Sequence, residues 1–210
     1  MDKIFLMNQR MRFVTVVSSF ILTVSLVFCL SAQEKNLPLP NADQPPSMGT
    51  GNIKVRLYAD YYCSPCRAFE PKAEPVIADL VKRNIVTITF IDTPFHKYSS
   101  LYTRYFLYIF HEKKDPAYLF RARNVLFEAS KENVKKSIYS ITDPKKLEEH
   151  LGKNDIHFKP YDVTPVFTAL EGYLEEDKIM ETPSCVIING DKKEFYKGGA
   201  NILKALSSLK

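Results

Sequence analysis

The sequence lacks a second Cys-x-x-Cys pair, an internal repeat and a strong excess of charge of either sign. A zinc site built from Cys63 and Cys66 would need a second ligand pair, and His150 and His157 are spaced too widely to form the usual one. Without a repeat, the 210 residues fit one domain, with room for an inserted subdomain. The net charge of +5 comes largely from scattered lysines, which favours a solvated surface over a nucleic-acid-binding face.

The N-terminal 32 residues carry the pattern of an export signal. Basic residues precede an uncharged run over residues 13–30, and small residues at 31–32 supply a cleavage point. Because 18 uncharged residues approach the length that crosses a bilayer, an uncleaved anchor through residues 13–30 is the alternative. The sequence therefore predicts export, with residues 1–32 as a signal peptide or N-terminal anchor. Residues 33–52, rich in proline, are predicted to form a linker, with an arm that becomes ordered on docking as the alternative.

The single Cys-x-x-Cys pair lies between a predicted strand, residues 53–59, and a predicted helix, whose apolar stripe runs from Phe69 to Leu80. This setting is typical of a redox dithiol, with a structural disulfide and a metal site as alternatives. Free backbone N–H groups and the helix dipole favour a thiolate at Cys63, whereas Cys66 lies one turn inside the helix. We therefore expect Cys63 to attack a disulfide and Cys66 to resolve the mixed disulfide.

The rest of the chain returns to strands after a long helical stretch. Residues 85–91 are β-branched and predict a second strand, and apolar residues at helical spacing predict four helices from about 98 to 177. The chain then ends with two strands, residues 185–189 and 194–197, and a helix that Asn201 caps. Three residues before prolines are predicted helix N-caps: Asp115, Asp143 and Thr164.

These features together resemble the thioredoxin superfamily and, within it, the exported DsbA-like thiol:disulfide oxidoreductases. The resemblance lies in Cys63-Ser64-Pro65-Cys66, in Pro71 inside the following helix, and in Thr182-Pro183 ahead of a strand. The long helical insertion, about 98–177, points to the DsbA-like group. The resemblance implies an α/β, thioredoxin-like fold over residues 53–210, with a central mixed sheet built from βαβ and ββα units and an all-helical insertion.

The resemblance also implies how such a protein works. It implies a periplasmic enzyme that exchanges disulfides with client polypeptides and is reset by a membrane redox partner of the DsbB or DsbD type. The resemblance implies that such an enzyme requires no organic cofactor and no metal. Pro183 should follow a cis peptide bond and face the dithiol, and the backbone of Thr182 should bind an extended client segment.

Some residues depart from the pattern of the DsbA-like relatives. No histidine lies between the two cysteines, and Pro65 matches thioredoxin, which is a reductant. Leu57 stands six residues before Cys63, where the relatives keep a buried acid, so Glu70 is the candidate proton partner. The alternative is that Glu70 is an exposed glutamate in the first turn that the helix dipole favours. We therefore predict a moderately poised oxidoreductase. A dedicated reductase of the cytochrome c maturation type and a metal-binding module that uses Cys63, Cys66 and a histidine are the alternatives.

Four further residues near these motifs receive weaker predictions. Tyr61 and Tyr62 suit either a client groove or an ordinary strand end. His96 is expected on a surface loop. Cys185 lies two residues after Pro183, so the two share a face of the strand, and Cys185 is predicted to be a buried, inert thiol.

Overall fold

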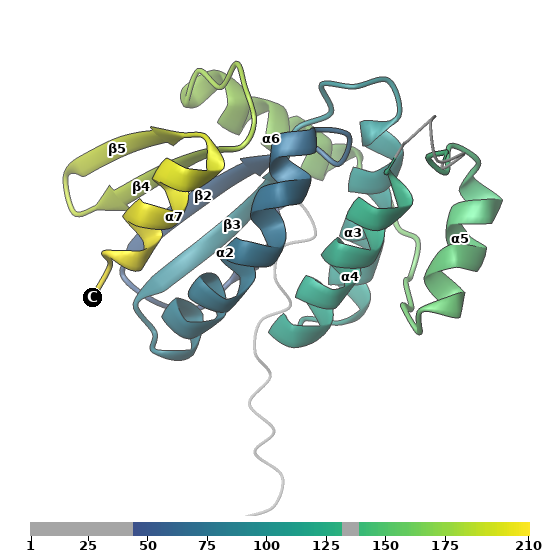
Figure 1. Cartoon of the computed structure of the whole chain (residues 1–210), viewed down its shortest axis with the longest axis horizontal. Helices are drawn as coiled ribbons and strands as arrows, with labels where there is room; N and C mark the ends of the chain where they lie inside the picture. The colour runs from purple at the N-terminus through teal and green to yellow at the C-terminus, as the bar shows by residue number, and fades with distance from the viewer. Residues whose placement is uncertain (1–43, 132–138) are drawn as a thin grey trace, which may run out of the picture. The chain divides into compact units, whose positions relative to one another are not determined.

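The computed structural model describes residues 44–131 and 139–210, and Figure 1 shows the arrangement of its helices and strands. The predicted signal or anchor and residues 33–43 lie outside this range. Within the described residues, no helix combines the length and apolar character that crossing a membrane requires. In chain order the elements are β1 (Ser47–Met48), β2 (Ile53–Ala59), α2 (Ser64–Lys82), β3 (Val86–Asp92), α3 (Ser99–Glu112), α4 (Pro116–Ala129), α5 (Pro144–Lys153), α6 (Thr164–Glu176), β4 (Ser184–Asn189), β5 (Lys192–Lys197) and α7 (Gly199–Ser207).

The strands form one mixed sheet in the order β1-β3-β2-β4-β5. Strand β2 pairs in parallel with β3 and antiparallel with β4, and β4 pairs antiparallel with β5. The chain thus forms β2-α2-β3, then four helices, then β4-β5-α7. This order confirms the thioredoxin-like fold and the helical insertion that the sequence predicted.

Alternate residues of the central strands face two separate apolar clusters. Leu57 and Phe90 belong to the larger cluster, with buried residues of α2, α3, α4 and α7. Tyr58 and Ile91, the next residue on each strand, belong to a smaller cluster with residues of α6. Because successive strand side chains point to opposite faces, helices cover the sheet on both sides. The last three residues of each central strand are therefore buried on both faces, whereas Lys54 near the start of β2 is exposed.

The sheet begins before Ile53, inside the segment predicted as a linker. Strand β1 pairs antiparallel with β3, and the side chain of Met48 is buried. The N–H of Gly51 donates to the carbonyl of Val86 at 3.1 Å. A Cβ on Gly51 would lie 2.1 Å from the backbone carbon of Ile85, so only glycine allows this close approach. The described part of the 33–52 segment is thus part of the folded domain.

The predicted helix starts are confirmed at two positions and wrong at two. Asp115 and Asp143 each cap a helix by accepting a backbone N–H bond, both at 2.8 Å. Thr164 is the first residue of α6, and Val163 holds the N-cap position without a side-chain bond. Asn201 lies inside α7, where its side-chain amide donates to a carbonyl one turn back instead of capping the helix.

A buried ion cluster joins the insertion to the sheet and to α2. Arg123 of α4 is only 1% exposed; it donates through Nε to Glu70 of α2 and through Nη1 to Asp92 at the end of β3, the latter at 2.9 Å. Asp92 also accepts the hydroxyl of Tyr61 at 2.9 Å. Burial alone would lower the pKa of Arg123, but the two carboxylates raise it well above its usual value. The arginine therefore stays charged, and its charge links α4 to α2 and to the end of β3.

We expect Arg123→Met to destabilise the protein by about 3–5 kcal/mol, because it leaves two buried carboxylates without their cation. Urea unfolding at neutral pH measures this loss. Arg121→Met is the matched control, since Arg121 lies on the same helix with an exposed side chain, and it should change the free energy of unfolding by about 0.5 kcal/mol or less. Equal effects of the two substitutions would contradict a special role for the buried cluster.

Candidate active site

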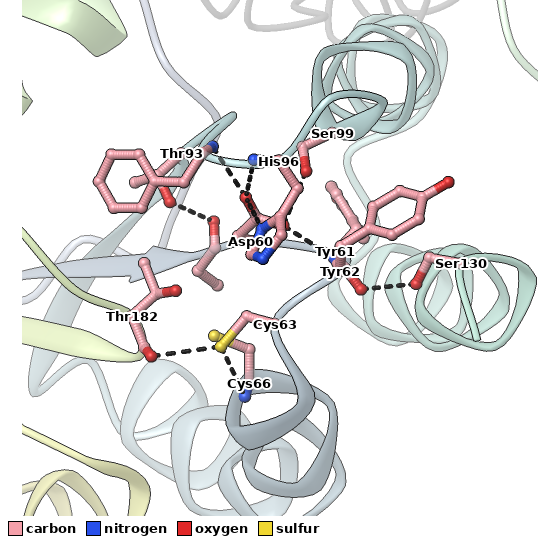
Figure 2. A network of polar contacts seen from close by, with 12 residues as sticks. Asp60, Tyr61, Tyr62, Cys63, Cys66, Thr93, His96, Ser99, Ser130 and Thr182 are labelled. Carbon is pink, nitrogen blue, oxygen red and sulfur yellow. Dashed lines mark hydrogen bonds and ion pairs between the residues drawn. The ribbon is translucent and has the colours of Figure 1, made fainter. Parts of the chain in front are cut away.

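Two cysteines with different surroundings lie at the start of α2. Cys63 is the N-cap residue, and Cys66 lies one turn inside the helix. The Cys66 N–H donates to the Cys63 sulfur at 3.3 Å, and the Cys63 thiol donates to the carbonyl oxygen of Thr182 at 3.2 Å (Figure 2). Both cysteines are free thiols. This geometry agrees with the predicted placement of the pair at a helix start.

The two sulfurs differ sharply in their tendency to ionise. A hydrogen bond from the Cys66 side chain is the main cause that lowers the pKa of Cys63 to about 6, against the opposing effects of partial burial and of the Asp60 carboxylate. Burial raises the pKa of Cys66 far above its usual value, since its side chain is fully buried. At neutral pH the pair therefore holds one thiolate, on Cys63, and one thiol, on Cys66.

The Asp60 carboxylate holds the turn that carries Cys63. It is buried and accepts the N–H of Tyr62 at 2.7 Å, the N–H of Phe95 at 2.8 Å and the hydroxyl of Ser99 at 2.7 Å. The carbonyl of Asp60 also accepts the Cys63 N–H at 3.1 Å. One side chain thus ties the turn to the loop after β3 and to the first residue of α3.

A second set of contacts holds the same turn from the other side. Arg67, the residue after Cys66, donates to the carbonyl oxygens of Tyr61 at 3.3 Å and Phe127 at 3.2 Å. The hydroxyl of Ser130, just after α4, donates to the Tyr61 carbonyl at 2.6 Å. The helical insertion therefore fixes the backbone that precedes the dithiol.

The Thr182–Pro183 peptide bond is cis, as the resemblance implied. Thr182 supplies the carbonyl group of this bond, and its oxygen lies 3.2 Å from the Cys63 sulfur. The structure thus brings Thr182, one of the two predicted substrate-binding residues, beside Cys63, although the two lie 119 positions apart along the chain.

Three other residues that the sequence singled out are buried, which limits the roles open to them. Glu70 is buried, so the exposed alternative is wrong, and its carboxylate bonds to Arg123. This contact favours a structural role for Glu70 over the predicted proton transfer. Cys185 is fully buried opposite Leu57, and burial raises its pKa to about 12, as expected of an inert thiol. Tyr61 is also fully buried and cannot line a client groove.

Sequence reasoning missed two residues that build the site, Asp60 and Arg67. Asp60 left a local signal, because an aspartate between a strand and a helix commonly bonds backbone N–H groups of the following turn. Arg67 left none, since its partner Phe127 on α4 lies 60 positions along the chain and its contact with the Tyr61 carbonyl follows no sequence pattern. His96 was expected on the surface; its side chain is 53% exposed but also pairs with Asp60.

The metal-binding alternative needs a third ligand close to the two cysteines. Within residues 44–131 and 139–210, no three His, Cys, Asp or Glu side chains are grouped so that they could hold a metal ion.

The chain matches the thioredoxin family model over residues 46–206. No curated protein sequence matches it. Among solved structures it is similar to a periplasmic thioredoxin-like protein from Salmonella enterica serovar Typhimurium, with 18% identity, a TM-score of 0.56 and coverage of 80% of this chain and 90% of that one. It is also similar to BdbD from Bacillus subtilis, at 21% identity, a TM-score of 0.51 and coverage of 77% and 90%. It is similar as well to alpha-DsbA1 from Wolbachia pipientis, with 16% identity, a TM-score of 0.56 and coverage of 82% of this chain and 94% of that one. At these identities the structures establish a shared fold.

We expect the alkylation of Cys63 by iodoacetamide to rise with pH through a midpoint near 6, the pKa of its thiol. The thiolate, which forms as pH rises, is the reacting species. The midpoint is a better readout than the rate at pH 7, because a thiolate of lower pKa is also a weaker nucleophile. Mass spectrometry of tryptic peptides measures the modification at each pH.

Cys185→Ser is the control and should leave this profile unchanged, since Cys185 is buried. A midpoint near about 8.5, the value of an ordinary cysteine, would contradict the stabilised thiolate.

Proposed function

Because the chain belongs to the thioredoxin family, we propose that it is an exported thiol:disulfide oxidoreductase that acts on client proteins through Cys63 and Cys66. One observation carries this proposal: two sulfurs one helical turn apart have different surroundings, since Cys63 at the N-cap accepts the Cys66 N–H at 3.3 Å whereas Cys66 is fully buried. Their pKa values are shifted in opposite directions as a result. A structural disulfide or a pair of core thiols would have no need for this difference.

The chemistry follows from the two protonation states. The Cys63 thiolate attacks one sulfur of a client disulfide, and the other client sulfur leaves as a thiolate. The Cys66 thiol then loses its proton and attacks Cys63, which forms the Cys63–Cys66 disulfide and releases the second client thiolate. The client gains two electrons and the protein loses two. In the reverse direction the same steps oxidise a client dithiol and reduce the protein.

The segment around Thr182 and Pro183 supplies the docking edge. The Thr182 carbonyl lies at the Cys63 sulfur, where a client sulfur must arrive. An extended client segment that pairs with this backbone would place its own cysteine in line with Cys63.

The pKa of Cys63 supports an intermediate redox poise. Thiolates of known enzymes range from a pKa of about 3.5 in DsbA, a strong oxidant, to about 7 in thioredoxin, a reductant. A more stable thiolate favours the dithiol state and hence a stronger oxidant. The value of about 6 lies between these limits. It supports an enzyme whose direction depends on the partner that resets it, and a dedicated reductase is the second candidate.

The location and the resetting partner are also part of the proposal. The basic residues and the uncharged run at the N-terminus support export. One similar structure is described as a periplasmic protein, which supports the same compartment. A membrane redox protein of the DsbB or DsbD type would then oxidise or reduce the dithiol after each turnover.

Cys66→Ala should trap a mixed disulfide at Cys63, because no second thiol remains to release the bound partner. Oxidised glutathione is the probe, and intact-mass spectrometry should show one glutathionyl group on most of the protein. The wild-type protein should not accumulate this adduct, and Cys63→Ala should form none. An adduct of equal yield on Cys63→Ala would refute Cys63 as the nucleophile.

The Cys63–Cys66 couple should have a reduction potential at pH 7 between about −270 mV, the value of thioredoxin, and about −120 mV, that of DsbA. Equilibration in glutathione buffers, followed by acid quenching and thiol counting, measures it. Cys185→Ser should give the same potential. A value near or below −270 mV would favour the dedicated reductase, and one at −120 mV or above would contradict the intermediate poise.

A further inference from the structure

A histidine from a different segment lies beside the charge that borders the dithiol. His96 belongs to the loop between β3 and α3, and its Nδ1 lies 3.1 Å from Oδ2 of Asp60. Figure 2 shows the imidazole ring against Asp60, next to the turn that carries Cys63. The Asp60 side chain is fully buried, whereas that of His96 is 53% exposed, so a buried carboxylate has a partner that reaches solvent.

The backbone of His96 is held against the same carboxylate oxygen. Its N–H donates to Oδ2 of Asp60 at 3.2 Å, which keeps the imidazole near that oxygen. The 3.1 Å contact of Nδ1 with Oδ2 becomes an ion pair only when the imidazole carries a proton.

Asp60 connects this histidine to the reaction. Its negative charge disfavours the Cys63 thiolate, and its carbonyl accepts the Cys63 N–H at 3.1 Å. The other titratable groups around the imidazole are Tyr62, whose ring stacks on it at 6.3 Å, and the adjacent Lys97 on its own loop. A proton on His96 therefore adds a positive charge next to the carboxylate that opposes the Cys63 thiolate.

We propose that His96 is a positioning residue that makes the Cys63–Cys66 couple pH-dependent: protonation of its imidazole offsets the Asp60 charge, stabilises the Cys63 thiolate and shifts the couple toward the dithiol. This inference rests on the proposed function. Histidine is the side chain that ordinarily changes charge between pH 5 and 8. Mild acidification would then make the protein a stronger oxidant of its clients than the two cysteines alone would make it.

The test compares the wild-type protein with His96→Gln, which keeps a polar side chain but carries no charge. Two molecules of reduced glutathione reduce the protein disulfide, which gives the protein dithiol and oxidised glutathione. The equilibrium constant of this reaction is measured for both proteins from pH 5.5 to 8. The ratio of the two constants, wild type over variant, removes the pH dependence of glutathione itself. We expect the ratio to reach about twofold to threefold near pH 6, the effect of one partly exposed charge pair, and to fall toward one at pH 8.

His111→Gln is the matched control. His111 lies near the opposite end of α3 from Ser99, about 18 Å along the helix, and its ratio should stay at one over the whole range. A ratio for His96→Gln that is flat with pH, or below one near pH 6, would overturn the inference while leaving the proposed function intact. Failure of the proposed function would look different, because the wild-type cysteines would then not equilibrate with glutathione at all.

Discussion

A negative charge on one sulfur at the first turn of a helix is the interaction on which the site depends. The charge needs hydrogen-bond donors, and α2 supplies the Cys66 N–H at 3.3 Å from the Cys63 sulfur. This N–H reaches the Cys63 sulfur only if the turn that carries Cys63, just before α2, is held in place. The contacts of Asp60 and Arg67 do this from the two sides of the turn, one through the loop after β3 and the other through α4. The helical insertion is therefore part of the redox site, not an addition to it.

The same arrangement explains why the two cysteines differ although they are one turn apart. The Cys63 side chain reaches the protein surface, with 8% of the residue exposed, whereas Cys66 is fully buried. Burial penalises a charge on Cys66, and Cys63 also disfavours the ionisation of Cys66, whereas the hydrogen bond from Cys66 favours the ionisation of Cys63. The dithiol therefore keeps one proton at neutral pH. In the proposed reaction this proton leaves when Cys66 attacks, which separates the nucleophilic step from the resolving step.

The sequence predicted what depends on local patterns and missed what depends on distant pairs. Strand and helix periodicity identified the central strands, the four helices of the insertion and the last hairpin, and the Cys-x-x-Cys spacing singled out the two cysteines that lie at the start of α2. The ion pairs of Arg123 with Glu70 and Asp92 join residues 53 and 31 positions apart, and the pair of Asp60 with His96 spans 36 positions. No periodicity marks such partners. The short strand β1 was missed for a related reason, because its proline-rich and glycine-rich surroundings are also typical of a linker.

Asp60 has two effects on the site that oppose each other. Its four hydrogen bonds from N–H and hydroxyl groups, three from backbone and one from Ser99, hold the turn where the thiolate must form. The same buried carboxylate disfavours that thiolate by like charge. A neutral side chain would remove the repulsion but would weaken the bonds, because hydrogen bonds to a charged acceptor are the stronger ones. The hydrogen bond from Cys66 is the main cause of the Cys63 pKa of about 6, and the Asp60 charge is a smaller opposing effect, so the charge that positions the turn also limits the ionisation of Cys63.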